Sequence, residues 1–125
     1  MSGSVFLLVM LGGGIGAALR FIIDGLIMRR VTSGYSWGTF VINSTGSFLL
    51  GLLTGLADSS VLSSDWLAVL GGGVMGGYTT FSTAMVDTVH MIQHRTYGRA
   101  LFNAFGMIVV TVLLALLGLV LGRSV

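Results

Sequence analysis

Long stretches without charge limit this chain to few folds. Three of them, 37–57, 66–86 and 100–122, each run for more than 20 residues without a formal charge. About 20 apolar residues are enough for a helix to cross the hydrocarbon core of a bilayer. Each stretch is therefore long enough to span a membrane, and the sequence predicts an all-α membrane protein.

The N-terminal apolar stretch is shorter, because only the 15 residues from Val5 to Leu19 are free of charge. To span a bilayer it must continue through Arg20 to Met28. A cleavable signal peptide is the competing interpretation, but no basic residue precedes Val5 and Arg20 lies within the segment. We therefore expect one four-helix domain over residues 1–125, with spans near 4–28, 37–57, 66–90 and 100–122.

The composition excludes several classes of protein. Charged residues make up 8% of the 125 residues, against about 25% in a soluble domain. The formal net charge of +2 is too small to indicate a nucleic-acid-binding patch. Cysteine is absent, which excludes thiol chemistry and a disulfide-stapled domain. No Ser/His/Asp or paired-carboxylate arrangement supports hydrolytic catalysis, so we do not expect an enzyme.

The arginines predict an orientation. The connections after the first and third spans carry four of them, while the opposite side of the membrane has only Arg123. Because positively charged connections stay in the cytoplasm, both termini are expected outside. The four are Arg29, Arg30, Arg95 and Arg99.

The third span contains five glycines between Gly71 and Gly77, followed by Thr79 and Thr80. Each glycine destabilises a helix interior by about 1 kcal/mol relative to alanine. The cluster therefore predicts a break at mid-span, where freed carbonyls are a natural site for a bare Na⁺. The alternative is close helix packing through two Gly-x-x-x-Gly motifs, Gly72–Gly76 and Gly73–Gly77. That alternative does not explain the hydroxyl residues that follow.

Four hydroxyl residues surround Phe81, and they are Thr79, Thr80, Ser82 and Thr83. An aromatic ring has a positive edge. A ring edge with hydroxyl and amide donors makes a site for a small, strongly hydrated anion without a fixed positive charge. The absence of a full charge matters because conduction requires the ion to leave as well as to enter.

Polar residues also recur in the second span, where Thr39, Asn43 and Ser47 are four residues apart and Thr54 follows. This spacing places them on one helix face. This face either forms hydrogen bonds between helices or lines a polar passage. Asn43 stands out because its amide offers two donors, which one backbone carbonyl cannot satisfy.

Arg20 and two histidines complete the candidate polar residues. Arg20 is either an interfacial residue that pairs with Asp24 one turn on, or a charge that faces a water-filled vestibule and concentrates anions. His90 and His94 are one turn apart near the end of the third span, and we expect them to be interfacial.

Three motifs carry a resemblance to a known family. They are GGGIGAALR over 12–20, GTFVINSTGSFLLG over 38–51 and GGYTTFST over 76–83. The chain resembles the Fluc (CrcB-type) fluoride channels along nearly its whole length. The resemblance implies a multi-pass protein of the cell membrane that lets F⁻ leave the cell passively.

The resemblance also implies an assembly and a site. Two chains pack antiparallel in one membrane and form two pores, with a structural Na⁺ that is not transported at the dimer centre. Backbone carbonyls of Gly76 and Thr79 hold the Na⁺. The vestibule arginine corresponds to Arg20. The ion pathway corresponds to Asn43, Phe81, Ser82 and Thr83.

The chain departs from the family pattern at two positions of the third span. A second phenylalanine is often present where Ala84 stands, and the usual glutamate is Asp87. The arginine bias also differs from the near balance of chains that insert both ways. These departures suggest an alternative, in which a homologous subunit of opposite orientation supplies the missing phenylalanine.

Two other classes of protein are further alternatives. A small proton-coupled multidrug exporter is also a short four-span dimer, but it needs a carboxylate inside the membrane, and Asp24 and Asp87 lie near span ends. A non-conducting assembly or regulatory subunit is the other class.

Overall fold

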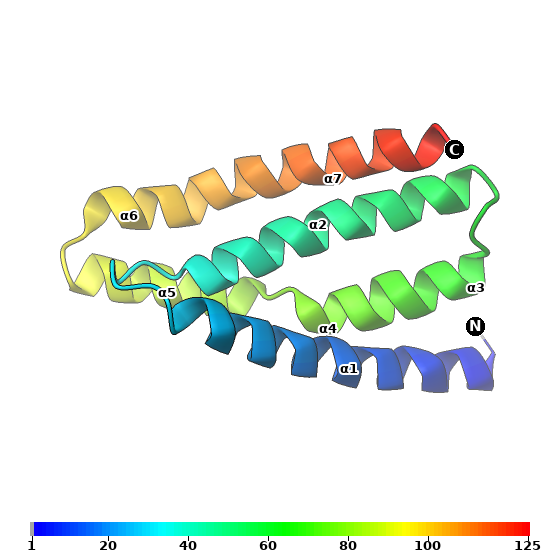
Figure 1. Cartoon of the computed structure of the whole chain (residues 1–125), viewed down its shortest axis with the longest axis horizontal. Helices are drawn as coiled ribbons and strands as arrows, with labels where there is room; N and C mark the ends of the chain where they lie inside the picture. Colours follow the sequence, from blue (N-terminus) through cyan, green and yellow to red (C-terminus); the bar gives the residue numbers. More distant parts are fainter. Residues whose placement is uncertain (1) are drawn as a thin grey trace.

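The computed structural model describes residues 2–125, and every regular element in this range is a helix. Four rods lie side by side, with both termini at one end of the molecule (Figure 1). The first two rods are α1 (Gly3–Met28) and α2 (Trp37–Asp58). The third rod comprises α3 (Ser64–Leu67), the π-helix η1 (Ala68–Met75), α4 (Gly76–Tyr78) and α5 (Phe81–Gln93). The fourth comprises α6 (Tyr97–Leu101), the π-helix η2 (Phe102–Gly106) and α7 (Met107–Arg123).

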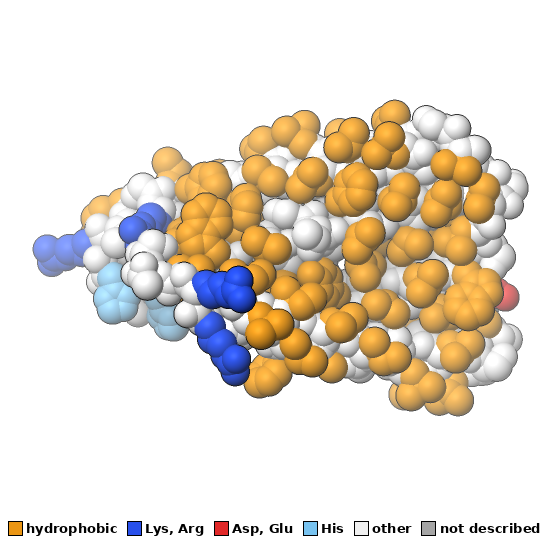
Figure 2. Space-filling view, in the orientation of Figure 1, with side chains coloured by type: hydrophobic (Ala, Val, Ile, Leu, Met, Phe, Trp, Pro, Cys, Tyr) orange, Lys and Arg blue, Asp and Glu red, His pale blue; other side chains and the backbone are white. Residues whose placement is uncertain are grey.

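Three rods are continuous helices long and apolar enough to cross a membrane, namely Gly3–Met28, Trp37–Asp58 and Tyr97–Arg123. The third rod is interrupted, so neither of its halves reaches that length alone. Hydrophobic side chains cover most of the visible surface, while arginine and histidine side chains gather at the end opposite the termini (Figure 2). The chain is a multi-pass membrane protein with four helical rods, as the sequence predicts.

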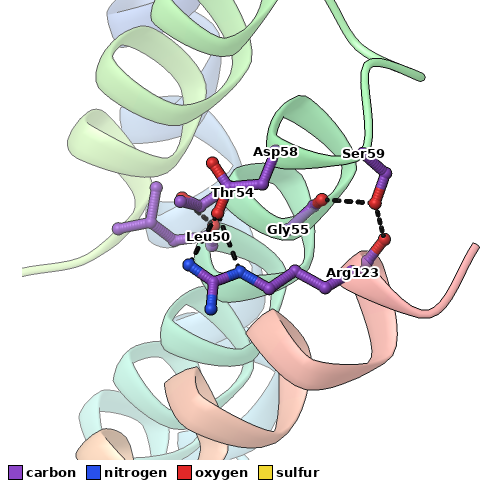
Figure 3. Close-up of polar contacts among 7 residues, drawn as sticks. Leu50, Thr54, Gly55, Asp58, Ser59 and Arg123 are labelled. Atoms are coloured by element: carbon purple, nitrogen blue, oxygen red, sulfur yellow. Dashed lines mark hydrogen bonds and ion pairs between the residues drawn. The ribbon is translucent and has the colours of Figure 1, made fainter.

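Rods two and four pack backbone against backbone. A Cβ atom added at Gly118 would collide with the carbonyl oxygen of Phe48, and one added at Gly51 would collide with that of Ala115. The end of this pair is tied by polar contacts (Figure 3). Arg123 forms an ion pair with Asp58 at 2.8 Å. Small residues thus allow the close approach that stabilises helix pairs in lipid.

The first rod packs in the same way on the glycines of the third. A Cβ atom at Gly77 would collide with the carbonyl oxygen of Gly13, and one at Gly73 would lie 2.8 Å from that of Val9. Gly72 and Gly76 instead face away from the rest of the chain and are exposed. The packing interpretation is therefore right for one of the two glycine motifs, and the other motif is left open on the surface.

The third span breaks just after its glycines rather than among them. The run from Ala68 to Met75 stays helical as a π-helix, so the expectation that the glycine-rich middle unwinds is wrong in its location. The chain is extended at Thr79 (ψ 158°) and Thr80 (ψ 121°). Packing on α1 holds the glycines helical, whereas β-branched threonines adopt extended backbone readily.

Candidate functional site

Asn43 of α2 holds the break together. Its Nδ2 donates to the Thr80 carbonyl oxygen at 2.8 Å, and its Oδ1 accepts from the Thr80 N–H at 2.8 Å. A second Nδ2 contact reaches the Met107 sulfur at 3.3 Å. The amide thus replaces the helical hydrogen bonds that Thr80 loses at the break. The side chain is only 8% exposed, so these buried backbone groups are satisfied within the protein, as lipid requires.

Two of the carbonyls at the break have donors elsewhere in the chain that have turned to other partners. In a continuous helix the N–H of Thr80 would bond the carbonyl of Gly76, but it donates to Asn43 instead. The N–H of Thr83 would bond the carbonyl of Thr79, but it donates to the Thr80 hydroxyl at 3.2 Å. Gly76 and Thr79 are the two residues whose carbonyls the family resemblance implies as cation ligands.

Thr80 caps the start of α5. Its hydroxyl accepts from the Thr83 N–H and donates to Thr83 Oγ1 at 3.2 Å, which is the usual N-cap role of threonine. Ser82 Oγ lies 3.4 Å from the Thr80 hydroxyl and is otherwise exposed. The hydroxyls of Ser82 and Thr83 therefore lie in the first turn of α5, beside the break.

Phe81 projects from the break onto the surface of the chain, where 73% of it is exposed. It lines a groove of about 230 Å³ whose polar members include Asn43, Ser47 and Thr80. Ser82 and Thr83 lie next to this groove in sequence but are not among the residues that line it. The structure therefore brings Asn43 and Phe81 to one surface, with the two hydroxyl residues at its edge.

Arg20 reaches the break from α1. Its Nε donates to the carbonyl oxygen of Gly77 at 3.5 Å, and within residues 2–125 it forms no ion pair with Asp24. The guanidinium thus lies at the C-terminal end of the glycine-rich helix, where a helix dipole favours positive charge. It is half-buried rather than fully exposed to lipid.

The four polar residues on one face of α2 mainly connect this helix to neighbouring elements. Thr39 donates to the Asp87 carboxylate at 3.3 Å, and Asn43 bonds Thr80 across the break. Thr54 bonds only the carbonyl of Leu50 in its own helix. Ser47 lines the groove beside Phe81. Two of the four polar residues therefore join α2 to α5 or to the break, and one faces the groove.

A polar pocket of about 450 Å³ opens near the arginine-rich end. Asp87 and His90 line it from α5, His94 from the residue that caps the end of α5, and Arg99 from α6. Both histidines are exposed, in keeping with the interfacial position expected for them. Among residues 2–125 there is no group of three His, Cys, Asp or Glu that would hold a metal ion.

Sequence reasoning missed Asn103. This residue of η2 has no exposed surface, and its amide bonds three groups from α5 and the loop before α2. The signal was present, because an amide in an otherwise apolar span is as informative at this position as it is at Asn43.

Comparison with known proteins finds relatives along nearly the whole chain. A family described as CrcB-like protein, camphor resistance (CrcB), matches residues 7–122. The Fluoride-specific ion channel FluC 1 of Leifsonia xyli subsp. xyli is 45% identical over 122 residues, which cover 98% of this chain and 89% of that protein. The Fluoride-specific ion channel FluC of Thermus thermophilus is 39% identical over 119 residues, 95% of each chain. FluC 2 of Mycobacterium tuberculosis strain H37Rv is 42% identical over 120 residues, 96% of this chain and 89% of that one.

Proposed function

Since this chain belongs to the CrcB-like protein family, we propose that it is a fluoride-specific ion channel of the cell membrane. In this proposal F⁻ leaves the cell passively through the protein, and fluoride inside the cell falls. The relatives are named ion channels rather than enzymes. Among the observations on the chain itself, the break that Asn43 clamps beside an exposed Phe81 supports the proposal most.

The proposed ion pathway uses Asn43, Phe81, Ser82 and Thr83. The positive edge of the Phe81 ring and the hydroxyl protons of α5 are donors for an anion without a fixed charge. Asn43 has one N–H to offer, because the contact from its Nδ2 to the Met107 sulfur engages only a weak acceptor. The bond to the Thr80 carbonyl then keeps the amide in place. Arg20, which bonds the Gly77 carbonyl next to the break, would raise the local concentration of anions there.

The proposed partner is a second copy of the chain in antiparallel orientation. Gly72 and Gly76 are exposed on the face of the third rod that the rest of the chain leaves open, and such small residues allow close approach of another helix. Phe81 is exposed on the same rod. A second chain would cover this surface and close the groove into a pathway.

A homologous subunit is the alternative partner, and the position of Ala84 favours it. Ala84 lines the groove beside Phe81 but offers no aromatic edge there. The bias of the arginines toward one end also fits a chain with one preferred orientation, with both termini outside. In this alternative the partner inserts the other way and supplies a phenylalanine.

The residues at the break fit a structural Na⁺. Carbonyl oxygens of Gly76 and Thr79 have lost their helical donors, and hard cations prefer oxygen ligands of this kind. Gly76 is exposed on the face proposed for the partner, so the same carbonyls of a second chain would complete the ligand set. The ion would stabilise the assembly without being transported.

Fluoride efflux from liposomes tests the function directly. The purified chain alone, followed with a fluoride electrode, is expected to release F⁻ but not Cl⁻. Asn43→Ala and Phe81→Ile are expected to reduce the F⁻ flux sharply while the dimer still assembles. Efflux only after addition of a homologous subunit would support the second partner model, and normal flux in both variants would refute the pathway.

A further inference from the structure

No continuous ladder of helical hydrogen bonds runs from α4 into the start of α5. The extended residues Thr79 and Thr80 separate it from α4, so the helical ladder does not continue into Phe81. Side-chain contacts must therefore set the rotation and the height of α5 in the bundle. Asn43 supplies one such contact at Thr80, and the next residue that holds α5 comes from the fourth rod.

Asn103 is that residue. Its Nδ2 donates to the carbonyl oxygen of Ala84 at 2.9 Å and to Thr88 Oγ1 at 2.8 Å, one turn further along α5. Its Oδ1 accepts from the Tyr35 hydroxyl at 2.9 Å. Every polar atom of the amide has a partner, and none of the side chain is exposed. Loss of these contacts without replacement partners would leave buried groups unsatisfied.

The partners of Asn103 are themselves fixed. The Thr88 hydroxyl donates to the Ala84 carbonyl at 2.8 Å, which closes a ring of three groups around the amide. Tyr35 is 4% exposed and packs edge to face on Trp37, with ring centroids 4.9 Å apart. Burial raises the pKa of its hydroxyl to about 12, so the hydroxyl remains a donor and holds the amide oxygen toward the loop.

We propose that Asn103 is a positioning residue for the first turn of α5. Its hydrogen bonds to Ala84 and Thr88 set the orientation of the pathway residues Phe81, Ser82 and Thr83. Ala84 directly follows Thr83, so the bond to its carbonyl lies on the first turn of α5. Asn103 belongs to the wall of the groove that Phe81 lines, but it has no exposed surface, so its proposed action is through the residues it holds. The inference rests on the proposed function only for its effect on flux, because the orientation of α5 can be measured without conduction.

The chain has no cysteine, so a single introduced thiol reports on α5. Ser82→Cys places this reporter on the exposed first turn of the helix, and its rate of modification by a water-soluble thiol reagent measures how the turn is oriented. The test variants are Asn103→Leu and Thr88→Val, each with and without the reporter. Tyr35→Phe is the matched control, because it removes one bond of the same amide but leaves both contacts to α5.

The Asn103→Leu variant is expected to change the modification rate at least about threefold and to lower F⁻ efflux per folded protein about tenfold or more, as small misplacements of reacting groups do elsewhere. Thr88→Val should shift both readouts in the same direction but less, and it serves where Asn103→Leu does not fold. Tyr35→Phe should lower the melting temperature and leave both readouts near those of the parent chain.

Two results would overturn the proposal. One is an unchanged modification rate in folded Asn103→Leu and Thr88→Val proteins. That result would mean that Asn103 stabilises the fold but does not orient α5. The other is a Tyr35→Phe variant that alters both readouts as strongly as Asn103→Leu. If the parent chain carries no F⁻ either alone or with a homologous subunit, the proposed function fails, and the modification rates still decide the role of Asn103.

Discussion

Asn43 and Thr80 exchange two hydrogen bonds of 2.8 Å across the break in the third span. The side-chain amide of one helix thereby takes the place of two backbone partners in another. This exchange explains how a membrane-spanning segment interrupts its helix without exposing polar backbone to lipid. It also makes the stability of the break depend on one side chain.

Asn43→Asp should therefore destabilise the protein. The carboxylate still accepts from the Thr80 N–H, but an oxygen replaces the Nδ2 donor that bonds the Thr80 carbonyl. Loss of a buried hydrogen bond with one partner left unsatisfied costs about 1–3 kcal/mol. A lower melting temperature in detergent is the expected result. Thr54→Val is the control on the same helix. Thr54 bonds only the Leu50 carbonyl within α2, so loss of its hydroxyl should change the melting temperature little.

Gly118→Ala should separate α2 from α7. The added Cβ would collide with the carbonyl oxygen of Phe48, so the backbones must move apart at a cost of about 1–3 kcal/mol. Gly25→Ala is the matched control, since Gly25 is an exposed helical glycine with nothing within 4 Å. The melting temperature should fall for Gly118→Ala only. Equal effects of the two substitutions would mean that the close approach does not stabilise the pair.

The sequence predicts the rods well and the break less well. Charge-free length identifies the second and fourth rods, which are continuous, and the third, which is interrupted. The donor count of Asn43 singles out a residue whose amide bonds Thr80 twice. The break lies two residues beyond the glycine run because Gly73 and Gly77 pack on Val9 and Gly13 of α1. Helix propensity is a local property and contains no information about packing on α1. A prediction from propensity therefore places the break at the glycines.

Asn103 could have been found by the same reasoning as Asn43. Both are amides in apolar spans, but Asn103 lies between aromatic residues, Phe102 and Phe105, and no polar residue follows it before Thr111. Its partners come from Tyr35 and from α5, which only the tertiary fold brings together. Residue type alone therefore indicated a buried amide, while its role required the structure.

Exchange of Na⁺ for K⁺ should weaken the assembly if the carbonyls of Gly76 and Thr79 hold a structural Na⁺. Cross-linking yield and melting temperature, measured on protein purified in each salt, report on the dimer. Gly76→Ala is an informative variant, because the nearest atom to the added Cβ, at 3.9 Å, is the Gly71 carbonyl oxygen. The single chain should tolerate it, whereas a closely approaching partner should not. Identical behaviour in both salts would argue against the ion.

Alkaline pH should destabilise the protein through Tyr35. Burial, with a smaller contribution from the Asp87 charge, raises the pKa of its hydroxyl from 10.0 to about 12. Since the folded-state pKa is raised, this stabilisation is complete below about pH 10 and is lost as the pH rises toward 12, with a total of about 3 kcal/mol at most. Tyr35→Phe should lower stability at neutral pH and flatten this dependence. Melting curves at pH 8 and pH 11.5 compare the two proteins, and equal slopes would contradict the assignment.

Ala84→Phe should fail to restore a second aromatic edge to the pathway. Ala84 is only 2% exposed, and its carbonyl accepts the bonds from Asn103 and Thr88. A phenyl ring at this position must displace the fourth rod, and overpacking of this kind costs about 1–3 kcal/mol. The variant should therefore melt lower and carry no more F⁻ than the parent chain. Ala104→Phe is a control at a half-buried position of the same groove. Faster efflux from a stable Ala84→Phe protein would show that the missing phenylalanine can be supplied by this chain itself.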